Sequence, residues 1–231
     1  MIEFNNVSLR YNLEEEILAD LNFKIKPGSF QFLIGPSGAG KTSLLRLIFL
    51  SLPLTRGTIT VFGKDSTSLN PKELSYFRRR MGVVFQDFYL LPHLTLYENA
   101  GLPLRVRGYK EMSYRDNLID LLKWIGLSER IDSYPKILSG DEHQRAIIAR
   151  ALIHQPEILL LDELKRSLDP SFNRRLLHLF TELNRRGTSI VIATHDWDLM
   201  DQYREYKARC LILNQKRLCV YELIQHLSKI K

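Results

Sequence analysis

The sequence predicts an α/β protein whose parallel β-sheet is covered by helices on both faces. Short strand-like segments alternate along the chain with longer helix-like segments. Residues 158–161 and 189–194 are almost unbroken apolar runs, which is typical of parallel strands that are buried on both faces. A Gly-rich loop directly follows another strand-like segment, and open α/β sheets bind their ligands at such strand ends.

The individual elements follow from local periodicity. Phe30, Phe32 and Ile34 alternate along a strand that stops at Gly35. Strands are predicted at residues 2–11, 21–34, 57–62 and 81–85, and helices at 41–50 and 116–124. The region from about 87 to 155 is predicted to be mostly helical, and the tail from about 210 to 231 to add a strand and a short helix.

Composition narrows the class of protein. With 231 residues and 45% hydrophobic content, the chain suits one globular domain and is not disordered. Cys210 and Cys219 are too few for a disulfide scaffold, so we expect a reducing compartment and two small buried side chains. The net charge of +7 leaves nucleic acid, an anionic membrane surface and a phosphorylated ligand open as partners.

The sequence shows neither a signal peptide nor the run of about 20 apolar residues that a spanning helix needs. Any association with a membrane is therefore expected to be peripheral.

The Gly-rich loop carries the most specific motif. It reads Gly35-Pro36-Ser37-Gly38-Ala39-Gly40-Lys41-Thr42 and lies between a strand and a helix, as a phosphate-binding P-loop does. Glycines let backbone N–H groups curl around an anion, and the following helix points its positive end at that anion. We expect Lys41 to reach the β- and γ-phosphates and the Thr42 hydroxyl to bind Mg²⁺.

A second motif delivers two carboxylates at the end of an apolar strand. Asp162 and Glu163 follow the run at 158–161, at the strand end where α/β sheets bind ligands. Asp162 fits the Mg²⁺ partner of a P-loop, and Glu163 is then placed to polarise an attacking water.

Four further features appear in a fixed order along the chain. Tyr11 follows the first strand, Gln86 follows the strand at 81–85, Ser139 and Gly140 precede a helix, and His195 ends the strand at 189–194. Together with the two motifs above, this order resembles the ATP-binding cassette (ABC) ATPase family over residues 2–215.

That resemblance implies a P-loop NTPase fold: a RecA-like core with a parallel sheet, an antiparallel β-subdomain and an inserted α-helical subdomain. The chain would be a single ABC ATPase domain. Its core lobe would comprise about residues 1–86 and 156–231, and its helical subdomain, which carries the signature loop, about residues 87–155.

The resemblance also implies a role for each motif residue. Tyr11 would stack on adenine, and the segment from Gly35 through Ser43 would hold the phosphates. Thr42, Gln86 and Asp162 would hold Mg²⁺. Glu163 would be the general base, with Gln86 near the attacking water and His195 against the γ-phosphate.

In this family two subunits enclose two ATP molecules, so the resemblance implies a homodimer in the ATP-bound state. The signature loop of one subunit faces the P-loop of the other. Its residues here would be Ser139, Gly140, Asp141 and Glu142, with Asp169 in the adjoining D-loop.

The segments 78–88 and 90–104 resemble the bacterial cell-division branch of the family. That branch works on the cytoplasmic face of the inner membrane, beneath a membrane-spanning partner of the FtsX type that regulates peptidoglycan hydrolysis. Its near relatives are lipoprotein-releasing and macrolide-exporting ATPases. Residues 88–91, which read Phe-Tyr-Leu-Leu, fit a docking groove for the partner and fit plain core packing equally well.

The chain departs from the family pattern at two places. Asp141 replaces the second glycine of the signature, and Leu164-Lys165-Arg166 replaces the usual Pro-Thr-Gly after the two carboxylates. A carboxylate facing a partner's γ-phosphate predicts slow turnover or weak dimerisation.

Two alternative functions remain. One is a binding module that signals by ATP occupancy. The other, a nucleic-acid ABC ATPase, is disfavoured because the chain has no long coiled-coil insertion and no second cassette.

Overall fold

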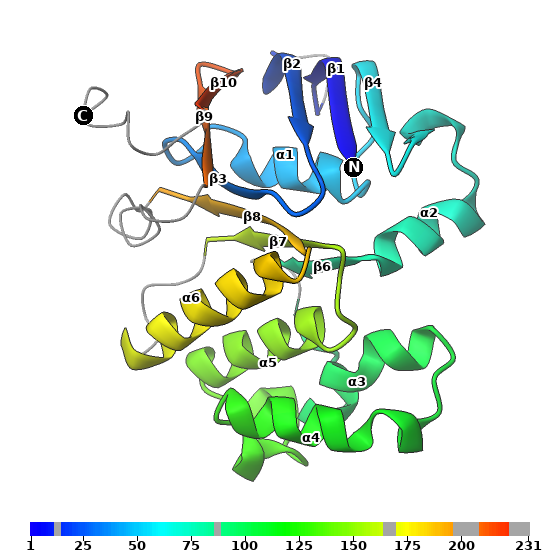
Figure 1. The fold of residues 1–231 in the computed structure, drawn as a ribbon, viewed down its shortest axis with the longest axis vertical. Coiled ribbons are helices and arrows are strands. Elements are labelled where there is room, and N and C mark those ends of the chain that lie inside the picture. Colours follow the sequence, from blue (N-terminus) through cyan, green and yellow to red (C-terminus); the bar gives the residue numbers. More distant parts are fainter. Residues whose placement is uncertain (12–14, 86–88, 164–169, 196–207, 222–231) are drawn as a thin grey trace.

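The protein contains two β-sheets of different kinds (Figure 1). The computed structural model describes residues 1–11, 15–85, 89–163, 170–195 and 208–221. The larger sheet has the strand order β10-β9-β3-β8-β7-β6, and its strands are parallel except for β10. These strands are β3 (Phe30–Ile34), β6 (Met81–Val84), β7 (Ile158–Asp162), β8 (Ser189–Thr194), β9 (Arg209–Asn214) and β10 (Arg217–Tyr221).

The parallel strands are buried on both faces, which explains their unbroken apolar sequences. In β7, Leu159 and Leu161 join the core shared with the helices below the sheet in Figure 1, whereas Ile158 and Leu160 join the core above it. Figure 1 shows α5 (Gly140–Leu152) and α6 (Pro170–Arg185) on one face and α1 (Lys41–Ile48) on the other. The predicted fold class is confirmed.

The smaller sheet is antiparallel, with the order β2-β1-β4-β5. Its strands are β1 (Ile2–Leu9), β2 (Leu18–Ile25), β4 (Arg56–Val61) and β5 (Lys64–Asp65). A single strand over residues 21–34 was the wrong expectation, because a turn at 26–29 separates β2 from β3 and sends them into different sheets. The turn is closed by a hydrogen bond of 3.2 Å from the Ser29 N–H to the Lys26 carbonyl.

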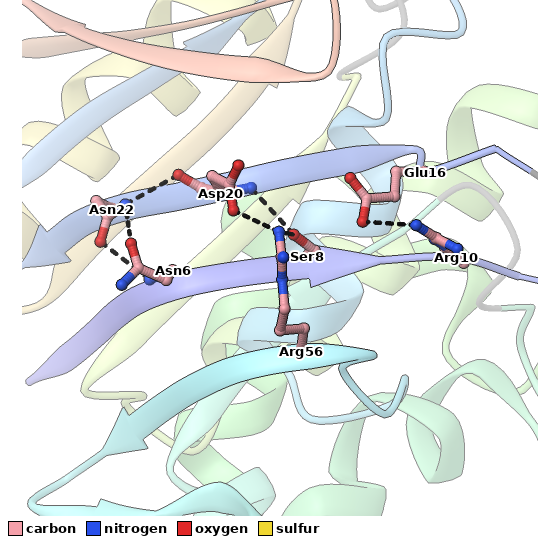
Figure 2. Close-up of polar contacts among 7 residues, drawn as sticks. All are labelled: Asn6, Ser8, Arg10, Glu16, Asp20, Asn22 and Arg56. Carbon is pink, nitrogen blue, oxygen red and sulfur yellow. Dashed lines mark hydrogen bonds and ion pairs between the residues drawn. The ribbon is translucent and has the colours of Figure 1, made fainter.

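A network of polar side chains on the antiparallel sheet holds the end of β1 in place (Figure 2). Asn6 and Asn22 are joined by two hydrogen bonds of 2.9 Å, one from the Asn6 backbone N–H and one from the Asn22 side-chain amide. Further along, the Arg10 guanidinium lies 3.1 Å from the Glu16 carboxylate. The Arg10–Glu16 ion pair thus lies just past the end of β1, next to Tyr11 in the chain.

The remaining helices lie mainly beyond the parallel sheet (Figure 1). They are α2 (Pro71–Arg79), α3 (Leu96–Val106) and α4 (Arg115–Trp124), with short 3₁₀ turns at Ser66–Ser68, Glu111–Ser113, Ser128–Arg130 and Pro135–Ile137. The i, i+3, i+4 spacing of Leu118, Leu121 and Leu122 predicts one apolar face on α4, and there Leu118 and Leu122 are fully buried whereas Leu121 is half-buried. None of the helices in the described ranges is long and apolar enough to cross a bilayer.

The C-terminal part differs from the expectation in two ways. It contributes two strands, β9 and β10, joined as an antiparallel hairpin, rather than one. Cys210 is buried as expected, but Cys219 lies exposed on β10, so the expectation for Cys219 was wrong. The predicted terminal helix lies outside the described residues.

Candidate functional site

The loop between β3 and α1 has the backbone path that its glycines predict. Gly35 lies so close to β9 that an added Cβ would come within 2.4 Å of the Leu213 carbonyl oxygen. Gly40 precedes the helix in a left-handed conformation, with φ of 97°, and its carbonyl accepts the Leu44 N–H at 2.9 Å. The loop therefore opens directly onto the N-terminus of α1, where an anion is favoured.

The Lys41 ammonium lies inside this loop. The residue is only 5% exposed, and its Nζ donates to the carbonyls of Gly35 at 2.9 Å and Pro36 at 3.0 Å. It also lies 3.5 Å from Oε1 of Glu163. A phosphate in the loop would therefore contact an ammonium group that is already buried and desolvated in the folded chain.

Thr42 and Asp162 meet across the gap between α1 and β7. The Thr42 hydroxyl donates to Oδ2 of Asp162 at 2.7 Å, and Asp162 is 3% exposed. Burial raises the pKa of this carboxyl above its ordinary value, and the negative charge of Glu163 adds to that shift, while the Thr42 hydrogen bond opposes it.

The chemistry of this pair fits Mg²⁺. Oδ1 of Asp162 is buried without a hydrogen-bond partner. A hydroxyl and a carboxylate are hard oxygen ligands, and Mg²⁺ commonly takes one or two protein ligands together with water and phosphate oxygens. Within the described ranges, no group of three or more His, Cys, Asp or Glu side chains could hold a metal without such help.

Glu163 and His195 lie side by side at the ends of β7 and β8. His195 Nδ1 is 3.2 Å from Oε1 of Glu163. Glu163 has a positive φ of 47°, and its N–H donates to the Ala193 carbonyl of the neighbouring strand at 3.0 Å. The sheet order thus brings Glu163 and His195, at the ends of two neighbouring strands, together with Lys41 at the start of α1. Gln86 and Asp169 lie outside the described residues.

Tyr11 lies beside the P-loop, and its hydroxyl shares a hydrogen bond of 2.8 Å with the Ser43 hydroxyl. A cavity of about 530 Å³ opens here, lined by Tyr11, Ile17, the loop residues 36–39, and Gln215 with Lys216 of the β9–β10 hairpin. An ion pair of 2.9 Å between Lys216 and Glu15 closes its rim. This cavity is large enough for a nucleoside next to the phosphate loop.

The residues 139–142 form the N-terminus of α5. The Ser139 hydroxyl accepts the Glu142 N–H at 3.2 Å, and the Glu142 carboxylate accepts the Ser139 N–H at 2.8 Å, which completes a capping box. Arg130 adds an ion pair of 2.8 Å to Glu142, and together these contacts lower the pKa of the Glu142 carboxyl. Gly140 and the half-buried Asp141 lie in the first turn.

Sequence reasoning did not identify Arg130, and no local pattern in the sequence pairs it with a residue twelve positions later.

A parallel α/β sheet with a P-loop and two consecutive carboxylates at the end of one strand defines a P-loop nucleoside triphosphatase. Residues 18–165 match the family described as ABC transporter, and residues 144–201 match an AAA domain described as putative AbiEii toxin, type IV toxin–antitoxin system. The chain belongs to the ABC transporter family and is an ABC ATPase.

The relatives agree with this assignment. The chain is 38% identical over 207 residues to the cell division ATP-binding protein FtsE of Escherichia coli K12, covering 90% of this chain and 93% of that protein. It is 35% identical over 205 residues to FtsE of Bacillus subtilis, covering 89% and 90%. It is 42% identical over 204 residues to the methionine import ATP-binding protein MetN of Photobacterium profundum, covering 87% of this chain and 59% of MetN.

A solved structure shows the same fold. It is a dimeric ATP-binding cassette in a post-hydrolysis state bound to ADP and phosphate. Its TM-score is 0.87 and its identity 32%, over 96% of this chain and 99% of that one.

Proposed function

We propose that this chain is an ATP-hydrolysing subunit that couples ATP-driven homodimerisation to a separate membrane-spanning partner of the FtsX type. The observation that carries the proposal is the convergence of Lys41, Thr42, Asp162, Glu163 and His195 at one edge of the parallel sheet. We further propose that residues 1–86 and 156–231 act as the core lobe, and 87–155 as the helical subdomain.

The proposed site gives each of these side chains one task. Lys41 neutralises phosphate charge, and Thr42 and Asp162 would hold Mg²⁺, which would supply further charge neutralisation. Glu163 accepts a proton from the water that attacks the γ-phosphorus, as the bond to ADP breaks and inorganic phosphate forms. His195 orients the Glu163 carboxylate through the contact of 3.2 Å.

In the proposed dimer a second chain completes the nucleotide end of this site, while Gly140 of the same chain lines a smaller cavity with Asp162 and Glu163. Among the described residues, none that lines the cavity at Tyr11 and residues 36–39 belongs to α5, where the signature residues Ser139 and Gly140 lie. In the proposed dimer the α5 N-terminus of one subunit approaches the ATP of the other. The dimeric state of the solved relative supports this arrangement.

A groove of about 640 Å³ between β6, α3 and α5 is the proposed docking site for the partner. Of the residues expected there, Leu90 is 3% exposed and packs in the core, whereas Tyr89 is 71% and Leu91 36% exposed at the groove. Phe88 lies outside the described residues. Docking there would hold the basic chain peripherally against the anionic cytoplasmic leaflet of the inner membrane.

The experiment that tests the proposal pairs the chain with the membrane protein encoded beside its gene. In a Cys219→Ser background, a Leu91→Cys variant should cross-link to that protein, and a matched Val220→Cys variant on exposed β10 should not. Phosphate release should rise when the partner is present. Equal cross-linking at both positions, with no change in phosphate release, would exclude this coupling.

One observation favours a second candidate function. The half-buried carboxylate of Asp141 lies in the turn that would approach the γ-phosphate of the second chain. A chain that binds ATP and dimerises but releases no phosphate, even with the partner present, would be a module that signals by occupancy. The same ATPase mechanism would also suit the subunit of a lipoprotein-releasing or macrolide-type exporter. The identity of the cross-linked membrane protein distinguishes that alternative from an FtsX-type partner.

A further inference from the structure

A cavity of about 540 Å³ beside α3 is lined by tyrosines and carboxylates. No described residue lines both this cavity and either the nucleotide cavity at Tyr11 or the proposed docking groove. Glu98, Glu111 and Asp132 bring three negative charges to its lining, and among the described lining residues Arg105 is the one positive side chain. The cavity is therefore acidic in a chain whose net charge is +7.

A glycine on α3 makes room for this cavity. Glu98, Gly101 and Arg105 follow one another at i, i+3 and i+7, so they share one face of the helix, and the glycine leaves a gap between two long side chains. The ring of Tyr114 packs at that gap, because a Cβ on Gly101 would come within 3.3 Å of the Tyr114 Cε2 and 3.7 Å of its hydroxyl oxygen. The phenol of Tyr114 thus lies at the wall of the cavity beside α3.

The Tyr114 hydroxyl has no protein partner in the described part of the chain. The residue is 6% exposed and lines the cavity, yet its hydroxyl forms no hydrogen bond with any described residue. Burial raises the pKa of Tyr114, and the negative charge of Glu111 adds to that shift, so the phenol is neutral at pH 7. Buried polar groups without a partner are rare in folded proteins, so this hydroxyl indicates a ligand in the cavity.

The three carboxylates keep oxygens for a ligand. One oxygen of Glu98 accepts the Thr95 N–H at 2.9 Å, and one oxygen of Glu111 accepts the Tyr97 hydroxyl at 3.0 Å. Over the described ranges, the Asp132 side chain has neither a hydrogen bond nor an ion pair, and no cation pairs with Glu98 or Glu111. The negative charge of the cavity is therefore not neutralised by an ion pair within the described chain.

The N-terminus of α3 does not make this cavity an anion site. The Leu96 and Tyr97 N–H groups donate to carbonyls in the segment 131–133, at 2.8 and 3.0 Å. The Glu98 N–H donates to the Thr95 hydroxyl at 3.2 Å. Because these first N–H groups of the helix are already used, α3 leaves oxygen acceptors rather than N–H donors at this end of the cavity.

We propose that this cavity binds an organic cation that carries N–H donors, a primary ammonium or a guanidinium, held by Glu111, Asp132 and the hydroxyl oxygen of Tyr114. Tyr97 and Tyr109 add two aromatic rings to the lining, and a cation near an aromatic face is further stabilised. Among the described residues no group of three His, Cys, Asp or Glu side chains could hold a metal ion, which favours an organic cation over a metal. This site lies apart from the nucleotide cavity and goes beyond the proposed function.

The test measures the binding of two matched pairs of probes to the full chain. One pair is spermidine and its fully acetylated, neutral form. The other is a capped tripeptide with a central arginine and the same peptide with citrulline, which has nearly the same shape but no charge. The ring signals of isotope-labelled tyrosine report binding by NMR. In at least one pair the charged probe should bind about ten-fold tighter or more, and the preference should shrink as salt is added.

Charge-removing variants locate the site. Glu111→Gln/Asp132→Asn should bind the charged and neutral probes equally, and the glutamine oxygen can still accept the Tyr97 hydroxyl. The matched control, Asp116→Asn/Glu129→Gln, changes two exposed carboxylates outside the cavity lining and should keep the preference. Both variants should retain the wild-type melting temperature and ATP hydrolysis.

Two further variants change the cavity in opposite directions. Tyr114→Phe removes only the hydroxyl and should weaken binding of the charged probe about five-fold. Arg105→Gln removes a like charge and should strengthen it about three-fold. Unchanged affinity in either variant would overturn the inference.

Equal affinity of the wild-type chain for the charged and neutral probes of both pairs would also overturn it. So would a preference that survives in Glu111→Gln/Asp132→Asn, or one that is lost equally in the control. A preference for spermidine alone would support the site and assign a free polyamine. A preference for the arginine peptide, alone or together with spermidine, would support it and include the side chain of another polypeptide.

Discussion

Asp162 is a buried carboxylate whose charge the fold stabilises poorly in the absence of a cation. It is 3% exposed, and Oδ1 has no hydrogen-bond partner. Because burial raises its pKa in the folded protein above the ordinary value of about 3.9, the folded state binds this proton more tightly than the unfolded chain does. The contribution of Asp162 to stability is therefore most favourable at low pH and is lost as pH rises from the unfolded pKa through the folded pKa.

An Asp162→Asn variant should consequently be more stable than the wild type at pH 7 without nucleotide. The amide removes the buried charge, and its oxygen still accepts the Thr42 hydroxyl. We expect a gain of about 1 kcal/mol, or roughly 2–4 °C in Tm, that shrinks as pH falls toward 4. Thermal unfolding over this pH range measures it. Mg²⁺ and ATP should raise the Tm of the wild type only, and a variant less stable than the wild type at pH 7 would contradict the account.

Glu163 is the proposed general base. Its carboxylate lies between the Lys41 ammonium, at 3.5 Å, and the His195 ring, at 3.2 Å. A Glu163→Gln variant keeps the shape but cannot accept the proton, so phosphate release should fall at least about 100-fold and an ATP-bound dimer should accumulate. Phosphate release and size-exclusion chromatography test this. Glu182→Gln, an exposed change on α6, is the matched control and should retain activity, whereas wild-type turnover in Glu163→Gln would remove Glu163 from the role of base.

At the scale of elements, the N-terminus of α5 explains why the chain accommodates Asp141. An acidic residue in the first turn stabilises its own helix by roughly 0.3–1 kcal/mol through the helix dipole. The same charge about 6 Å from a phosphate oxygen costs on the order of 3 kcal/mol per pair at an effective dielectric of about 20. Stability of the single subunit and closure of the proposed dimer therefore impose opposite demands on this position.

Removing the Asp141 charge should strengthen ATP-driven dimerisation. Asp141→Gly and Asp141→Asn should both raise the ATP-dependent dimer constant about ten-fold or more. The asparagine variant separates the effect of charge from the helix-weakening effect of glycine. Analytical ultracentrifugation with ATP and phosphate-release assays measure the two readouts. If Asp141→Gly raises neither the dimer constant nor phosphate release, Asp141 does not limit dimerisation or ATP turnover.

The loop that leads into α3 depends on one fully buried side chain. Asn99 Oδ1 accepts the Leu91 N–H at 2.7 Å, and its amide donates to the carbonyls of Leu91, Leu94 and Thr95 at 3.0, 3.0 and 2.9 Å. Asn99→Ala leaves these buried groups unpaired and should cost at least about 2 kcal/mol in the free energy of unfolding. Denaturant unfolding measures the loss. Asn22→Ala, at an exposed asparagine where water replaces the lost bonds, should cost clearly less, and equal losses would contradict this role.

Sequence patterns alone predict some strands of this fold and miss others. The strands β7 and β8 are predictable because both of their faces are buried, so nearly every residue is apolar. The turn between β2 and β3 separates two alternating patterns, one ending at Ile25 and one beginning at Phe30, and the Pro27-Gly28 pair between them was the available signal. Strand β10 is mostly exposed although four of its five residues, Leu218 to Tyr221, are apolar, so its place beside β9 is a tertiary effect.

At the scale of the whole molecule, the candidate site follows from the order of strands. The order β3-β8-β7 brings the ends of three apolar runs together, so His195 and Glu163 at two strand ends meet Lys41, which the loop after β3 places at the start of α1. The ion pair between Arg130 and Glu142 and the hydrogen bonds around Asn99 depend on how helices and loops pack, and no periodic sequence pattern predicts them. Local motifs therefore predict the residues beside the phosphate-binding loop. The contacts that hold the surrounding helices and loops in place depend on tertiary packing.

The proposed head-to-tail dimer makes a prediction that only two chains together can show. Lys41→Ala removes the phosphate-binding cation but leaves α5 intact. Ser139→Asp preserves the N-cap, because aspartate caps helices as well as serine does, and places a negative charge toward the partner's ATP. Each variant alone should be inactive. In a one-to-one mixture, half of the dimers are mixed and each has one intact pair of P-loop and signature, so about a quarter of wild-type phosphate release should return if the two sites act independently.

Titration of one variant into the other measures this recovery, which should peak near equal amounts. A mixture of Lys41→Ala with wild-type chain serves as the control, because its activity should fall steadily without a peak. If the two sites act independently and phosphate release of the mixture never exceeds the sum of the two variants alone, then neither chain uses the signature residues of its partner. We expect recovery at the Tyr11 cavity, since none of the described residues that line it belongs to α5 of the same chain, whereas Gly140 reaches only the smaller cavity at Asp162 and Glu163.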